Sequence, residues 1–232
     1  MTVGGEHTTP PPRQRQQQRR DARRNRELLL VAAHEVFTEQ GLDAPLDVIA
    51  RRAGIGNATL YRHFPTRAAL IDAVFHDQLT GTMAVGEQAR NAPDAWSGLT
   101  EYLRAVFATL AADRGTNDLM TTHVEGVEVL EAVHAHNRRT VESLLARGRA
   151  EGTVRADVTT EDVLFALAAL GRAVPALTGA TTPDAWHRPL ALFLDALRTT
   201  PPSPLPGPAL TADRLGDVLQ GLGPHRASGE RE

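Results

Sequence analysis

The stretch GIGNATLYRHFPTRAAL, residues 54–70, decides the fold of this chain. The glycines stop the helical pattern that precedes them, and Asn57 is a good N-cap for a new helix. Leu60 and Phe64 are four residues apart and share one face of that helix, and Pro65 ends it because the residue before a proline is disfavoured in the α region. The pattern predicts a helix of under three turns that buries two side chains and exposes the polar ones between them.

Two further helices are predicted before this one. Apolar residues at helical spacing indicate a helix that ends at Gln40, before Gly41, and a short helix over residues 45–53 with Pro45 in its first turn. Two short helices joined by a tight glycine-containing turn form a helix-turn-helix, whose second helix fits a DNA major groove of about 12 Å. The alternative is an ordinary three-helix corner with a solvated polar face.

The segment LLLVAAHEVFTEQGLDAPLDVIARRAGIGNATLYRHFPTRAAL, residues 28–70, closely resembles the DNA-binding domain of the TetR (tetracycline repressor) family. The resemblance follows the family signature from Ala53 and Gly54 through Leu60 and Phe64 to Leu70, and covers about residues 23–74. It implies phosphate contacts from Tyr61, His63 and Arg67 and base contacts from Thr59 and Arg62, with Asn57 and Ala58 near the groove. The DNA-binding residues expected on this basis are Arg23, Arg24, Asn57, Ala58, Thr59, Tyr61, Arg62, His63 and Arg67.

Two positions depart from the family pattern. The family usually has a Ser or Thr before its second helix that can touch phosphate, whereas this chain has Ala44 and Pro45. Ala58 replaces a frequent glycine, which leaves less room for close approach of the backbone. The first departure indicates that a phosphate contact is missing or is made by an arginine of the N-terminal arm.

Composition limits the class of protein. The chain has 232 residues, a formal net charge of −3, 41% hydrophobic residues and no cysteine, which excludes disulfides, thiolate metal sites and a cysteine nucleophile. No stretch approaches the roughly 18 consecutive apolar residues of a membrane span, and a cytoplasmic protein is expected. Between Arg13 and Arg26 there are seven arginines against one acidic residue, Asp21, so a basic arm precedes an acidic body. Such an arm attracts phosphate, although a solvated tail is the alternative reading.

The predicted fold class is all-α. A disordered arm is expected over residues 1–20, a helix-turn-helix DNA-binding domain over 21–66, a helical-bundle ligand-binding and dimerisation domain over 67–200, and a Pro-rich tail over 201–232. In the third of these, helices are predicted over about 67–91 and 94–112, near 119–125 after the loop DRGTND, and over 127–152 with an interruption near 133–137. Thr159 and Asp162 are spaced to cap the next helix, and residues 182–183 open the last, which Pro189 should kink.

The resemblance also implies a homodimer and a small-molecule effector. Two recognition helices held about 34–36 Å apart would read a pseudo-palindromic DNA operator. The residues expected at the dimer interface are Val163, Leu167, Leu170, Gly171, Val174, Trp186, Leu190, Phe193, Leu194 and Leu197. The residues expected to face an effector are Phe75, Leu79, Met83, Tyr102, Phe107, Met120, His123, Val124 and Phe165. No cofactor and no metal is expected.

Three other interpretations stay open at this point. His123, Glu131 and His134 could share a helical face and hold a metal, although their spacing favours solvated histidines. An enzyme built on a helical bundle is a second class, but no Ser-His-Asp order, phosphate loop or carboxylate pair supports it. A nonspecific nucleoid-type DNA binder that uses the arginine arm is the third.

Overall fold

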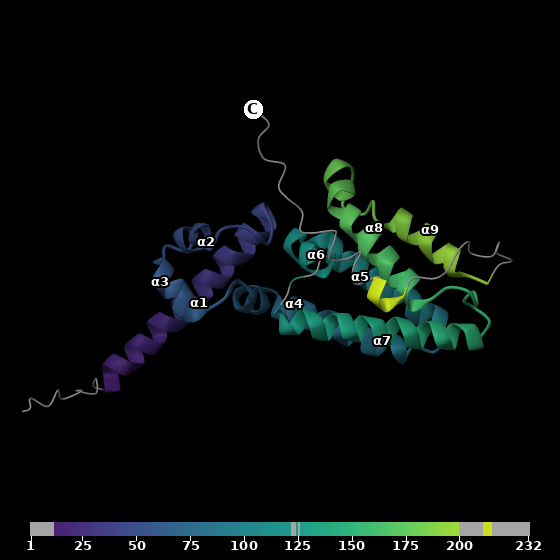
Figure 1. Ribbon diagram of the computed structural model, residues 1–232, viewed down its shortest axis with the longest axis horizontal. Coiled ribbons are helices and arrows are strands. Elements are labelled where there is room, and N and C mark those ends of the chain that lie inside the picture. The colour runs from purple at the N-terminus through teal and green to yellow at the C-terminus, as the bar shows by residue number, and fades with distance from the viewer. Residues whose placement is uncertain (1–11, 122–123, 125, 200–210, 215–232) are drawn as a thin grey trace, which may run out of the picture.

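The computed structural model describes residues 12–121, 124, 126–199 and 211–214 (Figure 1). Within those residues the chain forms a series of nine named helices. They are α1 Pro12–Gln40, α2 Leu46–Arg52, α3 Asn57–His63, α4 Arg67–Arg90, α5 Ala95–Ala112, α6 Arg114–Thr121, α7 Glu128–Ala150, α8 Thr160–Ala180 and α9 His187–Leu197.

The helices form two lobes joined by α4. Figure 1 shows α1, α2 and α3 at one end of the molecule and α5, α8 and α9 at the other, with α7 running along the larger lobe. The all-α architecture expected from the sequence, with a three-helix motif followed by a helical bundle, is confirmed.

The core of the smaller lobe extends beyond the three-helix motif. Leu29, Phe37, Ile49 and Leu60 are almost fully buried in it, and they pack with apolar residues from later helices. The later contributions come from α4, from α6 and from the start of α7: Leu70, Ile71, Phe75, Leu79, Leu119, Val129, Leu130 and Val133. Because α4 helps to close this core, the unit expected over residues 21–66 depends on residues beyond its predicted end.

A second core fills the larger lobe. It joins α5, α7, α8 and α9, with Tyr102, Phe107 and Leu145 among its fully buried side chains. Phe107 and Trp186 stack with ring centroids 6.2 Å apart, which attaches the start of α9 to α5. Met120 of α6 contacts both cores, so α6 lies at the junction between the lobes.

Four predictions about the helices are wrong. Residues 12–20 were expected to be disordered, but α1 begins at Pro12, since this arginine and glutamine run contains good helix formers. Most of the loop expected at 113–118 belongs to α6, which Asp113 initiates by accepting a hydrogen bond from the Thr116 amide. The interruption expected near 133–137 is absent from α7, which runs unbroken from Glu128 to Ala150. The last helix begins at His187 rather than at 182–183, so Pro189 lies in its first turn, where a proline causes no kink.

The predicted cap of α8 is confirmed. Thr159 accepts from the Asp162 amide, and the Asp162 carboxylate accepts from the Thr159 amide, which forms a capping box. By length and composition alone α8 could cross a membrane. A single apolar helix is weak evidence for that, because a helix packed within a water-soluble bundle meets the same criterion.

Candidate nucleic-acid interface

The turn between α2 and α3 is built around Gly54. Its φ of +69° lies in the left-handed region, and the Ile55 amide donates to the Ala50 carbonyl oxygen at 2.9 Å, which closes the end of α2. A Cβ added to Gly54 would meet no atom within 4 Å, so the conformation of the turn, rather than lack of space, favours glycine. Gly56, not Asn57, is the N-cap of α3, and Asn57 is the first helical residue.

Helix α3 has one buried and one exposed face, as the sequence predicts. Leu60 and Phe64 are 1% and 3% exposed and hold the helix against the core. Tyr61 is 53% exposed, and Arg62 beside it is exposed as well. The Arg62 guanidinium donates to the Thr59 hydroxyl at 3.3 Å, so this long side chain already lies along the outer face of α3.

The other expected contact residues of α3 differ in exposure. Asn57 and Ala58 are exposed, whereas Thr59 and His63 are half-buried. The His63 ring lies 6.4 Å from the Phe64 ring, centroid to centroid, at the end of the helix. The accessible surface of α3 therefore consists mainly of its first turn and of Tyr61 and Arg62.

Arg67 has a structural role that the sequence did not reveal. Its Nη1 donates to the carbonyl oxygens of Leu42 and Ala44 at 2.7 and 2.6 Å, so it fastens the loop between α1 and α2 to the start of α4. A phosphate contact by Arg67, the role implied by the resemblance, would use its other guanidinium nitrogens. The N-terminus of α4 beside it is capped by Thr66, whose hydroxyl accepts from the Ala69 amide at 3.1 Å.

The start of α2 lacks a side-chain cap. Pro45 occupies the N-cap position with no side-chain hydrogen bond, and Ala44 before it is only 4% exposed. The end of α2 is held by charge, because Arg52 lies 2.8 Å from Glu39 and 3.8 Å from Glu35 of α1. The hydrogen bond from Arg52 lowers the pKa of Glu39, so this contact is fully ionised near neutral pH.

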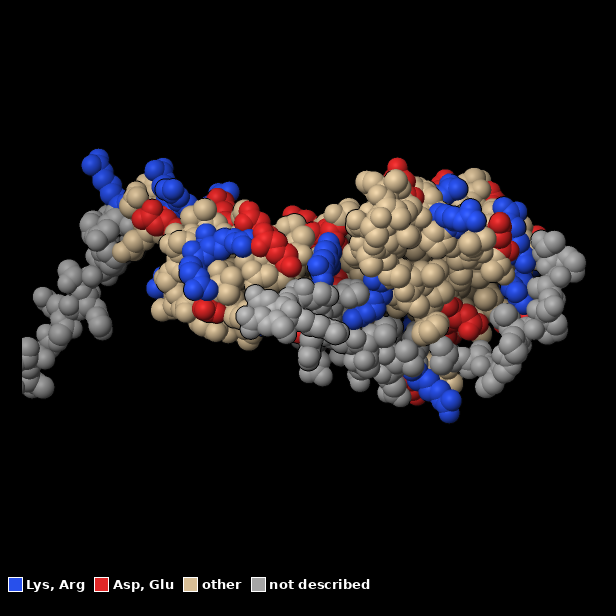
Figure 2. Space-filling view, turned by 90° about the horizontal axis from the view of Figure 1, so that it is seen from above, with Lys and Arg blue, Asp and Glu red and all other residues tan. Residues whose placement is uncertain are grey.

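Exposed arginines lie on the smaller lobe. Figure 2 shows blue atoms at this end of the molecule, interspersed with red Asp and Glu atoms. Arg26 of α1 lies over the Phe64 ring, with its Cζ 5.3 Å from the centroid, so it stands beside the end of α3. Arg23 and Arg24, which precede it, are exposed on α1.

The residues expected to face an effector do not line one cavity. Phe75 and Leu79 are fully buried in the core of the smaller lobe, whereas Tyr102 and Phe107 are fully buried in that of the larger lobe. Met83, Met120 and Val124 are half-buried, and His123 lies outside the described residues. Phe165 is 39% exposed, on the outer side of α8.

Two buried polar side chains lie between the helices here, and Tyr102 is the one of them that was expected to face an effector. The Tyr102 hydroxyl donates to Asn137 Oδ1 at 2.7 Å, and burial raises the pKa of this tyrosine. His136 of α7 is 4% exposed and its Nε2 faces Gly86 of α4, where an added Cβ would come within 2.2 Å. Burial and nearby Arg90 lower the pKa of His136, with Arg139 adding to the effect and Glu87 opposing it.

A hollow does lie between α4 and α5, at residues that the sequence did not single out. Its volume is 390 Å³, and its lining is mostly apolar or small: Asp77, Gln78, Gly81, Thr82, Val85, Ala105, Val106, Ala108, Thr109 and Ala112.

Across the described part of the chain, no group of three histidine, aspartate or glutamate side chains lies close enough to hold a metal ion.

Most of the residues expected at the dimer interface are buried inside the protomer rather than exposed on its surface. Val163, Leu167, Val174, Trp186, Leu190, Leu194 and Leu197 are at most 7% exposed, and all belong to the protomer's own core. Gly171 is buried against Leu110 of α5, and Leu170 and Phe193 are half-buried. The exposed sides of α8 and α9 carry other apolar residues, among them Phe165 and Leu192, which are 39% and 63% exposed.

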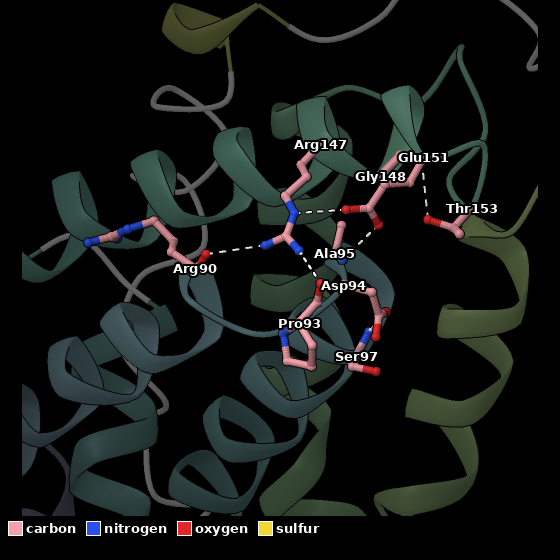
Figure 3. Close-up of polar contacts among 9 residues, drawn as sticks. All are labelled: Arg90, Pro93, Asp94, Ala95, Ser97, Arg147, Gly148, Glu151 and Thr153. Atoms are coloured by element: carbon pink, nitrogen blue, oxygen red, sulfur yellow. Dashed lines mark hydrogen bonds and ion pairs between the residues drawn. The ribbon is translucent and has the colours of Figure 1, made fainter.

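The far end of α4 is fastened to α7 by a polar clamp (Figure 3). Arg147 lies 2.8 Å from the Glu151 carboxylate and also donates to the Pro93 carbonyl oxygen at 2.8 Å. Glu151 in turn accepts from the Ala95 amide at 2.8 Å, at the start of α5. Asp94 caps α5, and its hydrogen bonds from Ser97 lower the pKa of its carboxyl group.

The chain is similar to bacterial transcription regulators. Residues 29–74 match the family described as bacterial regulatory proteins, tetR family, and residues 92–199 match the SbtR-like C-terminal domain of transcriptional regulators. No curated protein matches the chain.

The chain is also similar to solved structures of TetR-family proteins. A TetR regulator from Mycobacterium vanbaalenii is 33% identical over 78% of this chain and 99% of its own, with a TM-score of 0.42. One from Streptomyces coelicolor is 29% identical over 75% and 99%, with a TM-score of 0.49. A tetR-family protein from Rhodococcus RHA1 shares the fold, with a TM-score of 0.62 and 19% identity over 76% and 98%. The chain belongs to the TetR family of DNA-binding transcriptional regulators, and it is a regulator rather than an enzyme.

Proposed function

We propose that this chain is a cytoplasmic repressor that binds a pseudo-palindromic operator as a homodimer and leaves it when a small molecule binds the larger lobe. The observation that carries the proposal is the two-faced α3. Leu60 and Phe64 fix the helix from behind, while Tyr61 and Arg62 stand out from the surface. TetR-family regulators bind DNA operators and act as dimers, and this geometry suits that role.

Within α3, Arg62 is the residue best placed to read a base. A guanidinium can donate two hydrogen bonds to the O6 and N7 atoms of a guanine in the major groove. Asn57, Ala58 and Thr59 would enter the groove with it, while Tyr61 and His63 would contact phosphates on either side. Arg23 and Arg67 supply further positive charge.

The exposed apolar sides of α8 and α9 support dimerisation. Two large apolar side chains, Phe165 and Leu192, remain exposed there, with Ala169, Ala173 and Ala176 also exposed along α8. Both helices lie on the same side of the larger lobe (Figure 1). Contiguous exposed apolar surface on a soluble protein marks an interaction site, and a symmetric pair of such surfaces closes as a dimer.

For the effector, the hollow between α4 and α5 is the proposed entrance. Its 390 Å³ falls within the range of about 300–1,000 Å³ that is usual for ligand pockets, at the small end. Val85 and Val106 provide apolar walls, and Gln78, Thr82 and Thr109 provide polar groups. A compound bound there would touch α4, the helix that joins the two lobes.

The test of the proposed function is selection of genomic DNA fragments with the purified protein at two salt concentrations. The expected result is a small set of enriched fragments that share an inverted repeat, with half-site centres about one DNA turn apart. Enrichment of all fragments in proportion to their length would identify a nonspecific nucleoid-type binder and refute the proposal.

A further inference from the structure

The first half of α1 is a cationic helix that projects from the smaller lobe. Leu29 is the first buried residue among the described side chains of α1, and the helix from Pro12 to Leu28 has a length of about 25 Å. Figure 1 shows this part of α1 extending away from the other helices. We call it the α1 extension.

The arginines of the α1 extension follow two stripes. Arg19, Arg23 and Arg26 are spaced i, i+4 and i+7 and lie along one side, whereas Arg20 and Arg24 lie along another. The contacts at its inner end identify both sides. Arg26 lies over Phe64 at the end of α3, while Arg24 lines a 310 Å³ hollow with Arg52 and Ala53 at the end of α2. We call them the α3-side stripe and the α2-side stripe.

The arginines within each stripe repel one another in the free protein. Like charges four residues apart on a helix destabilise it, and Arg19 with Arg23 and Arg20 with Arg24 are such pairs. Within the extension Arg23 forms an ion pair with Glu27 at 2.9 Å, and these two side chains are 84% and 61% exposed. An exposed pair of this kind contributes little, so Arg23 can exchange Glu27 for a phosphate at small cost.

We infer that the α3-side stripe is a phosphate-binding rail that continues the DNA contact beyond α3, outside each half-site. The inference rests on the proposed function, because it takes α3 to lie in the major groove. Arg26 fixes the stripe beside the end of α3, and the helix carries Arg23 and Arg19 outward from there over about 10 Å. The α2-side stripe does not touch DNA. Of the two α1 arginines expected to bind DNA, Arg23 and Arg24, the inference therefore keeps Arg23 alone.

A rigid helix differs from a flexible arm in a measurable way. On a flexible arm every arginine is equivalent, and any two can be removed with the same effect on binding. On a helix, the effect of removing an arginine on DNA affinity depends on its stripe, because an arginine on the α2-side stripe points away from the phosphates. Each neutralised phosphate changes the slope of log K against log salt by about 0.9.

The experiment compares two double variants, Arg19→Gln with Arg23→Gln and Arg20→Gln with Arg24→Gln. Both remove two exposed arginines four residues apart, and glutamine keeps the helix propensity, so far-ultraviolet circular dichroism should not change. DNA affinity is measured from 50 to 300 mM salt on the selected operator and on a random duplex.

The α3-side variant should reduce the salt slope of the dimer by about 3 to 4, for four lost contacts, and weaken binding on the order of tenfold or more. The α2-side variant should change the slope by less than about 1. Hydroxyl-radical protection outside the half-sites should disappear for the α3-side variant alone.

Equal slope changes in the two variants, or a larger change for the α2-side variant, would overturn the inference. Failure of the proposed function gives a different result, because the parent would then prefer no operator. The random duplex still reports the slopes of both variants in that case, so the phosphate rail is tested either way.

Discussion

Leu192 and Leu194 provide a direct test of which side of α9 holds the dimer together. They are the same residue type, two positions apart in one helix, but they are 63% and 6% exposed. Leu194 packs in the protomer's own core with Leu190 and Leu197. An aspartate at position 192 therefore perturbs the outer surface, and an aspartate at 194 perturbs the fold.

The magnitude follows from the exposed fractions. Full burial of a leucine side chain contributes about 1.5–3 kcal/mol, so covering the exposed 63% of Leu192 contributes about 1–2 kcal/mol. A two-fold axis doubles this to about 2–4 kcal/mol, which corresponds to a roughly 30- to 1,000-fold weaker dimer. The carboxylates of Leu192→Asp add a further desolvation cost.

Sedimentation velocity and circular dichroism separate the two variants. Leu192→Asp should sediment as a monomer at concentrations where the parent is a dimer, with unchanged helix content and weaker operator binding. Leu194→Asp should lower the thermal unfolding midpoint sharply, because a buried unpaired charge costs several kcal/mol out of a typical stability of about 5–15 kcal/mol. A dimer of unchanged strength in Leu192→Asp, with operator binding like the parent's, would show that this side of α9 is not the interface.

Three further predictions address base reading, packing and pH. Arg62→Ala should lose the preference at one base position per half-site, by about 1–3 kcal/mol in selection profiles, with other positions unchanged. Gly98→Ala should lower stability by about 1–3 kcal/mol in thermal unfolding, because its Cβ would lie 2.4 Å from a carbonyl oxygen of α4. Its control, Gly81→Ala, meets no atom within 4 Å and should stabilise α4 by about 0.5–1 kcal/mol. The folded state lowers the pKa of His136 below 6.5, so the unfolded state takes up the proton first as the pH falls. Stability against urea should therefore fall as the pH drops below 6.5. His136→Gln should make this fall smaller.

Local features of the fold could be predicted from the sequence because short-range chemistry determines them. The turn at Gly54 needs a positive φ, and in the helix that follows it the spacing of four residues places Leu60 and Phe64 on one face. The same applies to the capping box of Thr159 and Asp162, whose two hydrogen bonds need only a spacing of three residues.

Which side of α8 and α9 packs inside the protomer could not be predicted, because hydrophobic periodicity does not distinguish the buried side from the exposed one. α8 is apolar on both sides, with Val163 and Val174 turned inward and Phe165 turned outward. A helix of this kind shows no polar stripe to mark the solvent side. In α9 the predicted face, with Leu190 and Leu194, is a real apolar face, but α5 of the same protomer covers it rather than a partner.

The spread of the expected effector residues over two cores has a different origin. Phe75 and Tyr102 are both large and apolar and lie at inward positions of neighbouring helices, yet they belong to two separate cores. Which buried side chains of α4 contact those of α5 depends on how the two helices cross, and the sequence does not show this. The hollow at that crossing exists because small residues such as Gly81 and Ala108 line it, and small residues give no signal in a search for apolar side chains.

The way α4 is held explains how the larger lobe can move the smaller one. Its far end is fixed to α7 through Arg147 and the turn at Pro93, while its near end belongs to the core that holds α3. At 1.5 Å per residue α4 is about 36 Å long, so a rotation of about 10° around the clamp shifts its near end by about 6 Å. A second link runs from α6 to α1, where Asp113 accepts from the Thr38 hydroxyl at 3.0 Å and lies 3.2 Å from His34. If the proposed effector tilts α4 at its crossing with α5, the near end of α4 carries α1 and α3 along with it, since they share one core. In the proposed dimer that movement would alter the distance between the two copies of α3.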